Sequence, residues 1–352
     1  MMKSGIQSWE EERESRKSID INKICKFGIK CLDDVLYGIL KKDFIVIGAD
    51  SGSGKSEICL KIAIHNAREG RKVGLYFIEG GHVEAISRIK WGLMCDRYFK
   101  NDMRGMEMNY RKWRMNMIAD PRMDQLEEDC LEETKAILEN IYLYGYEKGL
   151  TIEGFIESLL YFLKPEPGFE DDPFSHKHEV DLIIIDHLQY FTLTNPKQEL
   201  SEQSSILKSV NDIVHSHKIP VILVSHLRKK EKDRGLPSQE DFYGTSNTPK
   251  MSTISITISS SPSTDGVNYP TFFRFVKSRT KIPSNYALLS NFSLEKGTYA
   301  DEYYCYKLKY DKPDSDALDK KDIPAHFNRA TPKPIGKDHK TIMRLEDVEW
   351  AE

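Results

Sequence analysis

The feature that most constrains the fold is a glycine-rich loop placed between an apolar run and a helix-forming segment. Residues 48–56 read Gly-Ala-Asp-Ser-Gly-Ser-Gly-Lys-Ser and directly follow the apolar run 44–47, while 57–62 has the composition of a helix start. Gly52 and Gly54 carry no Cβ, so the backbone can turn tightly and point its N–H groups at phosphate oxygens. A buried strand, a glycine-rich turn and a helix in this order predict a phosphate-binding loop.

The residue types in this loop predict how ATP and Mg²⁺ are bound. Lys55 is expected to reach the β- and γ-phosphates, and the Ser56 hydroxyl to ligate Mg²⁺. The positive N-terminal end of the following helix adds to the attraction for phosphate. Ala49 stands where the strict pattern has glycine, and the alternative interpretation is a chance turn rich in serine and glycine. The predicted nucleotide-binding residues are Ala49, Asp50, Ser51, Gly52, Ser53, Gly54, Lys55 and Ser56.

Composition limits the classes of function that remain. The chain has 352 residues, of which 30% are charged, and a net charge of −4, so any contact with nucleic acid must come from a local basic patch. The six cysteines are scattered without a Cys-x-x-Cys pair, which favours a reduced, cytoplasmic protein over a zinc or disulfide framework. No apolar run approaches the ~20 residues that a membrane span requires, so no membrane contact is expected.

The order of apolar runs predicts an α/β fold. Continuous apolar strands alternate with segments of helical character, and this pattern is typical of a parallel sheet covered on both faces. After residue 252 the pattern changes to hairpin-like strands, and from residue 311 it becomes polar, which predicts a loosely held tail. The expected organisation is an N-terminal helical arm (1–21), one large domain (22–310) and the tail (311–352). The predicted strands are 73–78, 140–144, 182–185, 220–224, 252–260, 270–277 and 302–309, and the predicted helices are 8–19, 83–98, 122–139, 151–163 and one over 206–214.

Three polar residues follow the ends of strands that belong to the predicted parallel sheet. Asp186, Glu79 and His226 each come directly after an aliphatic run. The carboxyl ends of parallel strands line the ligand crevice of an open α/β sheet. Asp186 is therefore a candidate Mg²⁺ ligand, Glu79 a candidate base for the attacking water, and His226 a candidate donor that senses the terminal phosphate. The alternatives are an ordinary strand-end aspartate, a solvated loop glutamate and a structural histidine.

Together these residues resemble the RecA-type ATPases, and among them the DnaB-like replicative helicases (superfamily 4) and the related KaiC modules. A glutamate at the second strand is typical of that group, as in Phe77-Ile78-Glu79. Asp186-His187-Leu188-Gln189 is similar to its Asp-Tyr-Leu-Gln, and Ser225-His226-Leu227-Arg228 to its Ser-Gln-Leu-Asn. Lys277-Ser278-Arg279 follows a late strand, where the group carries a lysine and an arginine finger.

The resemblance implies a RecA-like core with an antiparallel C-terminal extension and a ring of, in the typical case, six copies. ATP would then lie between subunits, with Glu79 as the catalytic base and with Lys277 and Arg279 supplied by the neighbouring copy. A loop from 229 to 250 would grip single-stranded DNA, and a loader or another replication protein would be a further partner. Two alternatives stay open: the loop is merely solvated, or the chain is a DNA- or protein-binding switch ATPase that does not unwind. The lysines and arginine expected to contact DNA are Lys229, Lys230, Lys232, Arg234 and Lys250.

Overall fold

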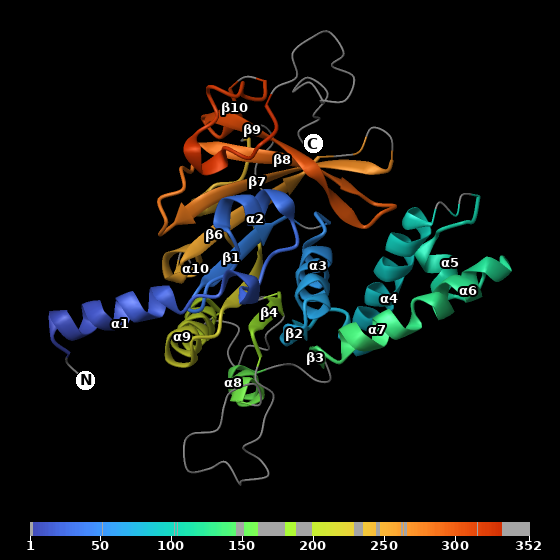
Figure 1. Cartoon of the computed structure of the whole chain (residues 1–352), viewed down its shortest axis with the longest axis horizontal. Helices are drawn as coiled ribbons and strands as arrows, with labels where there is room; N and C mark the ends of the chain where they lie inside the picture. The colour runs from blue at the N-terminus through green and yellow to red at the C-terminus, as the bar shows by residue number, and fades with distance from the viewer. Residues whose placement is uncertain are drawn as a thin grey trace.

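The structure is a computed structural model of the chain, and its elements are arranged around one large twisted sheet (Figure 1). It describes residues 3–50, 52–101, 103, 105–145, 151–160, 180–187, 199–228, 235–243, 247–261, 263, 266–314 and 316–332. Within these residues no helix is long and apolar enough to cross a membrane.

The sheet combines a parallel half with an antiparallel half. Its strand order is β10-β9-β8-β7-β6-β1-β5-β4-β2-β3. The strands from β6 to β3 run parallel to their neighbours, and those from β6 to β10 are antiparallel. This confirms the predicted α/β class with its antiparallel extension. The strands are β1 (Phe44–Ala49), β2 (Val73–Phe77), β3 (Ile141–Gly145), β4 (Leu182–Asp186), β5 (Val221–His226), β6 (Ile254–Ser260), β7 (Asn268–Ser278), β8 (Tyr286–Ser293), β9 (Thr298–Lys309) and β10 (Lys312–Pro313).

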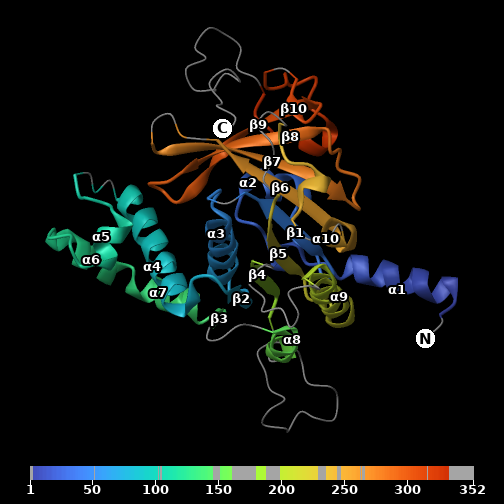
Figure 2. The same cartoon turned by 180° about the vertical axis from the view of Figure 1, so that it is seen from behind.

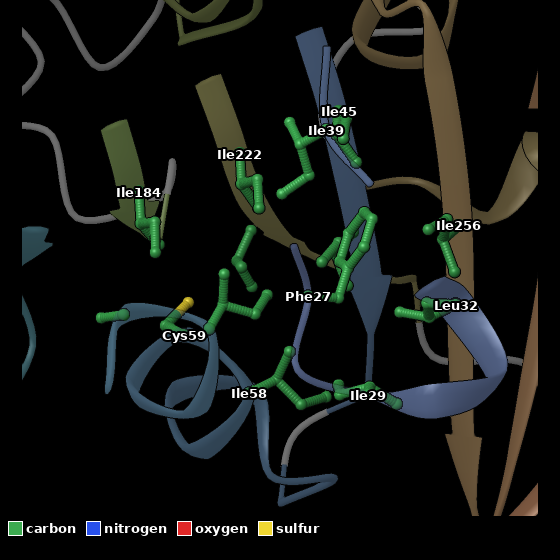
Figure 3. Packing of buried hydrophobic residues seen from close by; sticks show 14 of the residues in the cluster. Phe27, Ile29, Leu32, Ile39, Ile45, Ile58, Cys59, Ile184, Ile222 and Ile256 are labelled. Atoms are coloured by element: carbon green, nitrogen blue, oxygen red, sulfur yellow. The ribbon is translucent and has the colours of Figure 1, made fainter. Parts of the chain in front are cut away.

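Helices cover both faces of the parallel half, because its central strands β1, β5 and β4 are buried at nearly every position. Ile45 and Ile47 of β1 face one core with Phe27 and helix α3, whereas Val46 faces a second core with helices α8 and α9. Alternate residues of a strand point to opposite faces, so one continuous apolar run serves both cores. Figure 3 shows Phe27 inside the first core, with Ile29, Leu32 and Ile58 around it. The helices involved are α2 (Lys30–Leu36), α3 (Lys55–Arg68), α8 (Ile152–Leu160), α9 (Glu199–His217) and α10 (Asn247–Met251).

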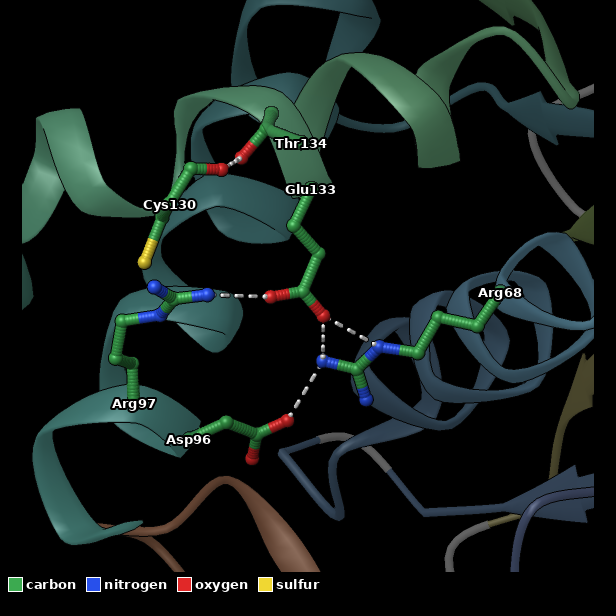
Figure 4. A network of polar contacts seen from close by, with 6 residues as sticks. All are labelled: Arg68, Asp96, Arg97, Cys130, Glu133 and Thr134. Atoms are coloured by element: carbon green, nitrogen blue, oxygen red, sulfur yellow. Dashed lines mark hydrogen bonds and ion pairs between the residues drawn. The ribbon is translucent and has the colours of Figure 1, made fainter. Parts of the chain in front are cut away.

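A group of helices between β2 and β3 stands beside the sheet and has a small core of its own. The group consists of α4 (Gly81–Lys100), α5 (Tyr110–Arg114), α6 (Pro121–Asp129) and α7 (Leu131–Leu138). Ion pairs tie it to the end of α3: Arg68 contacts both Asp96 and Glu133 at 3.0 Å, and Arg97 contacts Glu133 at 3.3 Å (Figure 4). The helix that the sequence predicts over 122–139 is interrupted at Cys130, where α6 ends and α7 begins.

The N-terminal helix α1 (Gly5–Lys17) projects from the body and buries none of its residues (Figures 1 and 2). Its first turn is closed by a capping box, in which the Ser4 side chain accepts from the Gln7 backbone N–H and the Gln7 side chain accepts from the Ser4 N–H. A short turn, η1 (Ile21–Lys23), connects it to the domain.

The described part of the predicted tail is packed against the core, contrary to the expectation of a loose segment. Phe327, in the turn η5 (Ala325–Phe327), is 1% exposed, and Ala330 is 5% exposed. Arg329 contacts Asp34 of α2 at 3.1 Å, and the Thr331 N–H donates to the Tyr303 carbonyl. The stretch is polar in overall composition, but a few of its apolar residues are buried in the core. Residues 333–352 lie outside the described part of the chain.

Candidate functional site

The phosphate-binding loop connects the end of β1 to the start of α3, as its sequence predicts. Gly52 and Gly54 have φ of +80° and +79°, the left-handed region that side chains disfavour, so glycine is needed at both positions. The Ser53 hydroxyl donates to the Asp50 carbonyl at 2.6 Å and closes the turn. Ser51 lies outside the described residues.

Lys55 places a buried positive charge at the base of this loop. It is 5% exposed, and its Nζ donates to the Ala49 carbonyl at 3.1 Å and also to the Asp50 carbonyl. Burial lowers the pKa of Lys55, while the charges of Asp50, Asp186 and Glu79 oppose that shift. A phosphate entering the loop would meet an ammonium group whose present partners are neutral carbonyl oxygens, which an anion can replace.

Asp186 is suited to hold a divalent cation. It ends β4, is fully buried, and neither of its carboxylate oxygens accepts a hydrogen bond in good geometry among the described residues. Burial raises its pKa to about 6, whereas the nearby Ser56 hydroxyl lowers it. A buried carboxylate without hydrogen bonds is costly unless a cation neutralises it, and Mg²⁺ prefers carboxylate and hydroxyl oxygens. The residues present therefore fit the predicted Mg²⁺ site.

Glu79 follows β2 and lies beside Asp186, because β2 is paired with β4 and Phe77 stands opposite Asp186 in that pairing. Its side chain is 48% exposed, so water can reach the carboxylate. Glu79 Oε2 lies 3.6 Å from Nε2 of His187, which is 2% exposed. The position agrees with a carboxylate that orients or deprotonates a water next to the phosphate-binding loop.

A pair of neighbouring histidines extends this cluster to β5. His226 ends β5 opposite Ala49 of β1, and its ring contacts that of His187 at a tilt of 35°, with ring centroids 4.2 Å apart. Burial lowers the pKa of His226 and Lys55 lowers it further, while Glu79 opposes both; the net shift favours the neutral imidazole. Sequence reasoning missed His187 as a site residue, although its place directly after Asp186 was a usable signal. Its φ of +82° is unusual for a side chain other than glycine.

The structure does not bring Lys277 and Arg279 to this cluster. The Arg279 N–H donates to the Thr253 carbonyl, and the Thr253 N–H donates to the carbonyl of Phe44, the first residue of β1. β1 ends at Ala49, five residues after Phe44, and the phosphate-binding loop follows Ala49. At about 3.3 Å per residue, Arg279 therefore lies roughly 16 Å away, at the opposite edge of the sheet.

Lys277 donates hydrogen bonds to carbonyl groups around the C-terminal end of α10. Its Nζ donates to the carbonyls of Pro249, Lys250 and Ser252 at 2.6, 2.6 and 2.7 Å. Lys250 itself is exposed at this same edge of the sheet. The other four residues predicted to contact DNA, Lys229, Lys230, Lys232 and Arg234, lie outside the described residues.

A cavity of about 420 Å³ adjoins the phosphate-binding loop. Its walls come from Gly52–Gly54, the start of α3, helices α4 and α5, and the strands β6 to β9. Trp91, Tyr110 and Phe292 contribute aromatic surface, and Glu57 and Arg88 contribute charge. Sequence reasoning missed this cavity, because its lining residues are spread along the chain from Gly52 to Tyr299.

Comparison with solved structures places this arrangement in a known fold. The chain is similar to a solved ATPase domain, with a TM-score of 0.61 and 17% identity over 85% of this chain and 99% of that one. It is also similar to a DnaB-like replicative helicase, solved with a view to its interactions with primase, with a TM-score of 0.60 and 17% identity over 85% of this chain and 67% of that one. The RadB recombinase aligns with a TM-score of 0.48 and 14% identity over 78% of this chain and 98% of that one. No protein-family model matches the chain, and no curated protein matches it significantly. The chain thus has the RecA-like fold, which it shares with that solved ATPase domain.

Proposed function

We propose that this chain is an ATP-hydrolysing motor that assembles into a ring, translocates on single-stranded DNA and unwinds duplex DNA during replication. Lys55 and the loop backbone bind the phosphates, Ser56 and Asp186 hold Mg²⁺, and Glu79 orients the attacking water. The bound Mg²⁺ would neutralise charge on the β- and γ-phosphates. The nucleoside part would occupy the adjoining cavity, whose volume falls in the range of about 300–1,000 Å³ that is usual for ligand pockets.

One observation carries the proposal of a ring. The nucleotide-binding residues lie at one edge of the parallel sheet, and the exposed Arg279 lies at the other. An arginine that stabilises the transition state is worth about 10³–10⁵ in rate, but this one cannot reach the site of its own copy. The active site is therefore complete only when a second copy presents Arg279 to it.

A mixing experiment tests this assignment. Arg279→Ala and Lys55→Ala are each expected to hydrolyse ATP poorly alone, because one lacks the arginine and the other the phosphate-binding lysine. In a 1:1 mixture, random assembly pairs an intact loop with an intact arginine at about one interface in four, so about a quarter of wild-type turnover should return. A mixture that stays inactive while co-assembling would refute the trans arrangement. Lys320→Ala, an exposed control in the C-terminal segment, should hydrolyse normally.

The motor is tested by hydrolysis and mass together. ATP turnover should rise strongly with single-stranded DNA, and a hexamer-sized species should form with a non-hydrolysable ATP analogue. If both hold, displacement of a labelled strand from a forked duplex follows as the assay for unwinding. Turnover that is indifferent to DNA would replace the motor by a switch ATPase whose partner is a protein.

A further inference from the structure

The cavity beside the phosphate-binding loop has one acidic wall. Among the described residues that line it, Glu57 is the one acid and Arg88 the one base. Glu57 lies in the first turn of α3 and directly follows Ser56, the last residue of the loop. Its side chain therefore stands where the phosphate-binding part of the site meets the aromatic part.

A nucleoside triphosphate presents its parts to this site in a fixed order. The phosphates occupy the loop backbone and the N-terminal end of α3. The sugar comes next, and the base, a flat aromatic ring, suits the walls formed by Trp91, Tyr110 and Phe292. The donor groups that come closest to Glu57 are thus the hydroxyls of the sugar.

We propose that Glu57 selects ribonucleotides, by accepting hydrogen bonds from the 2′- and 3′-hydroxyls of the bound nucleotide. This inference rests on the proposed binding of ATP at the loop. A carboxylate offers two acceptor oxygens and no donor, and a vicinal diol offers two donors, so the two groups are complementary. An acidic residue recognises the ribose in the same way in dinucleotide-binding folds.

The surroundings leave the Glu57 carboxylate available to a ligand. Burial raises its pKa, and the charges of Lys61 and Arg88 oppose that shift; none of the described residues hydrogen-bonds to it. The Arg88 guanidinium is held by Glu84, with Nε 2.8 Å from Oε1, so it stabilises the Glu57 charge without covering the carboxylate. Glu84 also accepts from the Tyr110 hydroxyl at 3.0 Å, which fixes this wall of the cavity.

The test compares three ligands on the full chain in the presence of Mg²⁺: ATP, 2′-deoxy-ATP and inorganic tripolyphosphate, by calorimetry. The wild type should bind ATP about tenfold or more tightly than 2′-deoxy-ATP, as a hydrogen bond to a charged group supports. Glu57→Ala should bring the two nucleotides within about twofold of each other by weakening ATP alone, with tripolyphosphate unchanged. Glu57→Gln keeps the shape and one acceptor and should lose part of the preference. Glu69→Ala, an exposed acid at the far end of α3, should behave as the wild type.

Two outcomes would overturn the inference. Equal affinities of the wild type for ATP and 2′-deoxy-ATP would show that the protein does not recognise the 2′-hydroxyl of the sugar. Tighter binding of all three ligands by Glu57→Ala would show that the acid repels phosphate rather than binding ribose. A wild type that binds neither ATP nor tripolyphosphate would instead refute the proposed function itself.

Discussion

The packing of Phe327 makes the C-terminal segment part of the domain, and its removal should cost stability. Phe327 is 1% exposed and lies in the core that also contains Phe27 and the helix after the phosphate-binding loop. Its ring centroid is 5.8 Å from that of Tyr286 and 6.5 Å from that of Phe275. Phe327→Ala would leave a cavity beneath α2.

The expected loss follows from the burial of this ring. Truncation of a buried phenylalanine to alanine costs about 3–5 kcal/mol, part of which is the cavity that remains. The surrounding segment is a short turn near the surface and can partly collapse, so we expect the lower part of that range, about 3–4 kcal/mol. At roughly 2–4 °C per kcal/mol for a domain of a few hundred residues, the midpoint of thermal unfolding should fall by at least about 6 °C.

Urea unfolding followed by circular dichroism measures this loss directly. Tyr310→Ala is the matched control, because Tyr310 is an aromatic residue of the same region that is 89% exposed, and its removal should change the free energy of unfolding by less than about 0.5 kcal/mol. Phe327→Leu should lie between the wild type and Phe327→Ala. A loss below about 1 kcal/mol for Phe327→Ala would refute the packing of this segment against the core.

Two further predictions concern a positioning residue and pH. His187→Ala should lower kcat about tenfold with the KM for ATP nearly unchanged, because the ring packs between Glu79 and His226 and orients both; His187→Gln should recover part of the loss, and steady-state kinetics that show a changed KM with an unchanged kcat would contradict this role. Burial would raise the pKa of Asp34, but hydrogen bonds from Lys30, Arg329 and Tyr303 outweigh it and hold the pKa below its usual value. The stability that Asp34 contributes is therefore present above the unfolded pKa of about 3.9 and is lost as the pH falls through the lower folded pKa. Asp34→Asn should cost about 2 kcal/mol at pH 7 and progressively less as the pH falls below the unfolded pKa in urea titrations, whereas a difference independent of pH would contradict the charge-based account.

Local chemistry made it predictable that polar residues gather at the carboxyl ends of the parallel strands. Glycines at positions 52 and 54, and aliphatic runs that end in Glu79 and Asp186, are local signals. The rule that parallel strands end at a common edge then brings both carboxylates together, and Phe77 indeed pairs with Asp186.

Long-range packing made the rest unpredictable. Helical periodicity continues through 122–139. In the structure, however, Leu126 packs in the small core beside α4, whereas Ile137 packs in the large core. The helix is interrupted at Cys130, between these two positions. Periodicity reports how often an apolar residue recurs and not which core it joins. The cavity lined by Trp91 and Phe292 was hidden for the same reason, since each ring alone reads as ordinary core.

The sheet also determines how copies of this chain must associate if Arg279 is to act. The phosphate-binding loop lies at one end of the parallel strands, and Arg279 lies at the opposite end. A contact between Arg279 of one copy and the loop of another therefore joins two different surface patches. Head-to-tail association makes this contact once between each pair of neighbours and closes into a ring or continues as a filament, whereas a two-fold dimer would have to hold both patches in one interface and make the contact twice. Lys277, two residues before Arg279, is bonded to three carbonyls around the end of α10. If Arg279 moves toward a neighbour's phosphate, Lys277 would transmit that movement to the end of α10 and to Lys250. This transmission would connect the nucleotide bound by one copy to the loop of the next copy that is predicted to bind DNA.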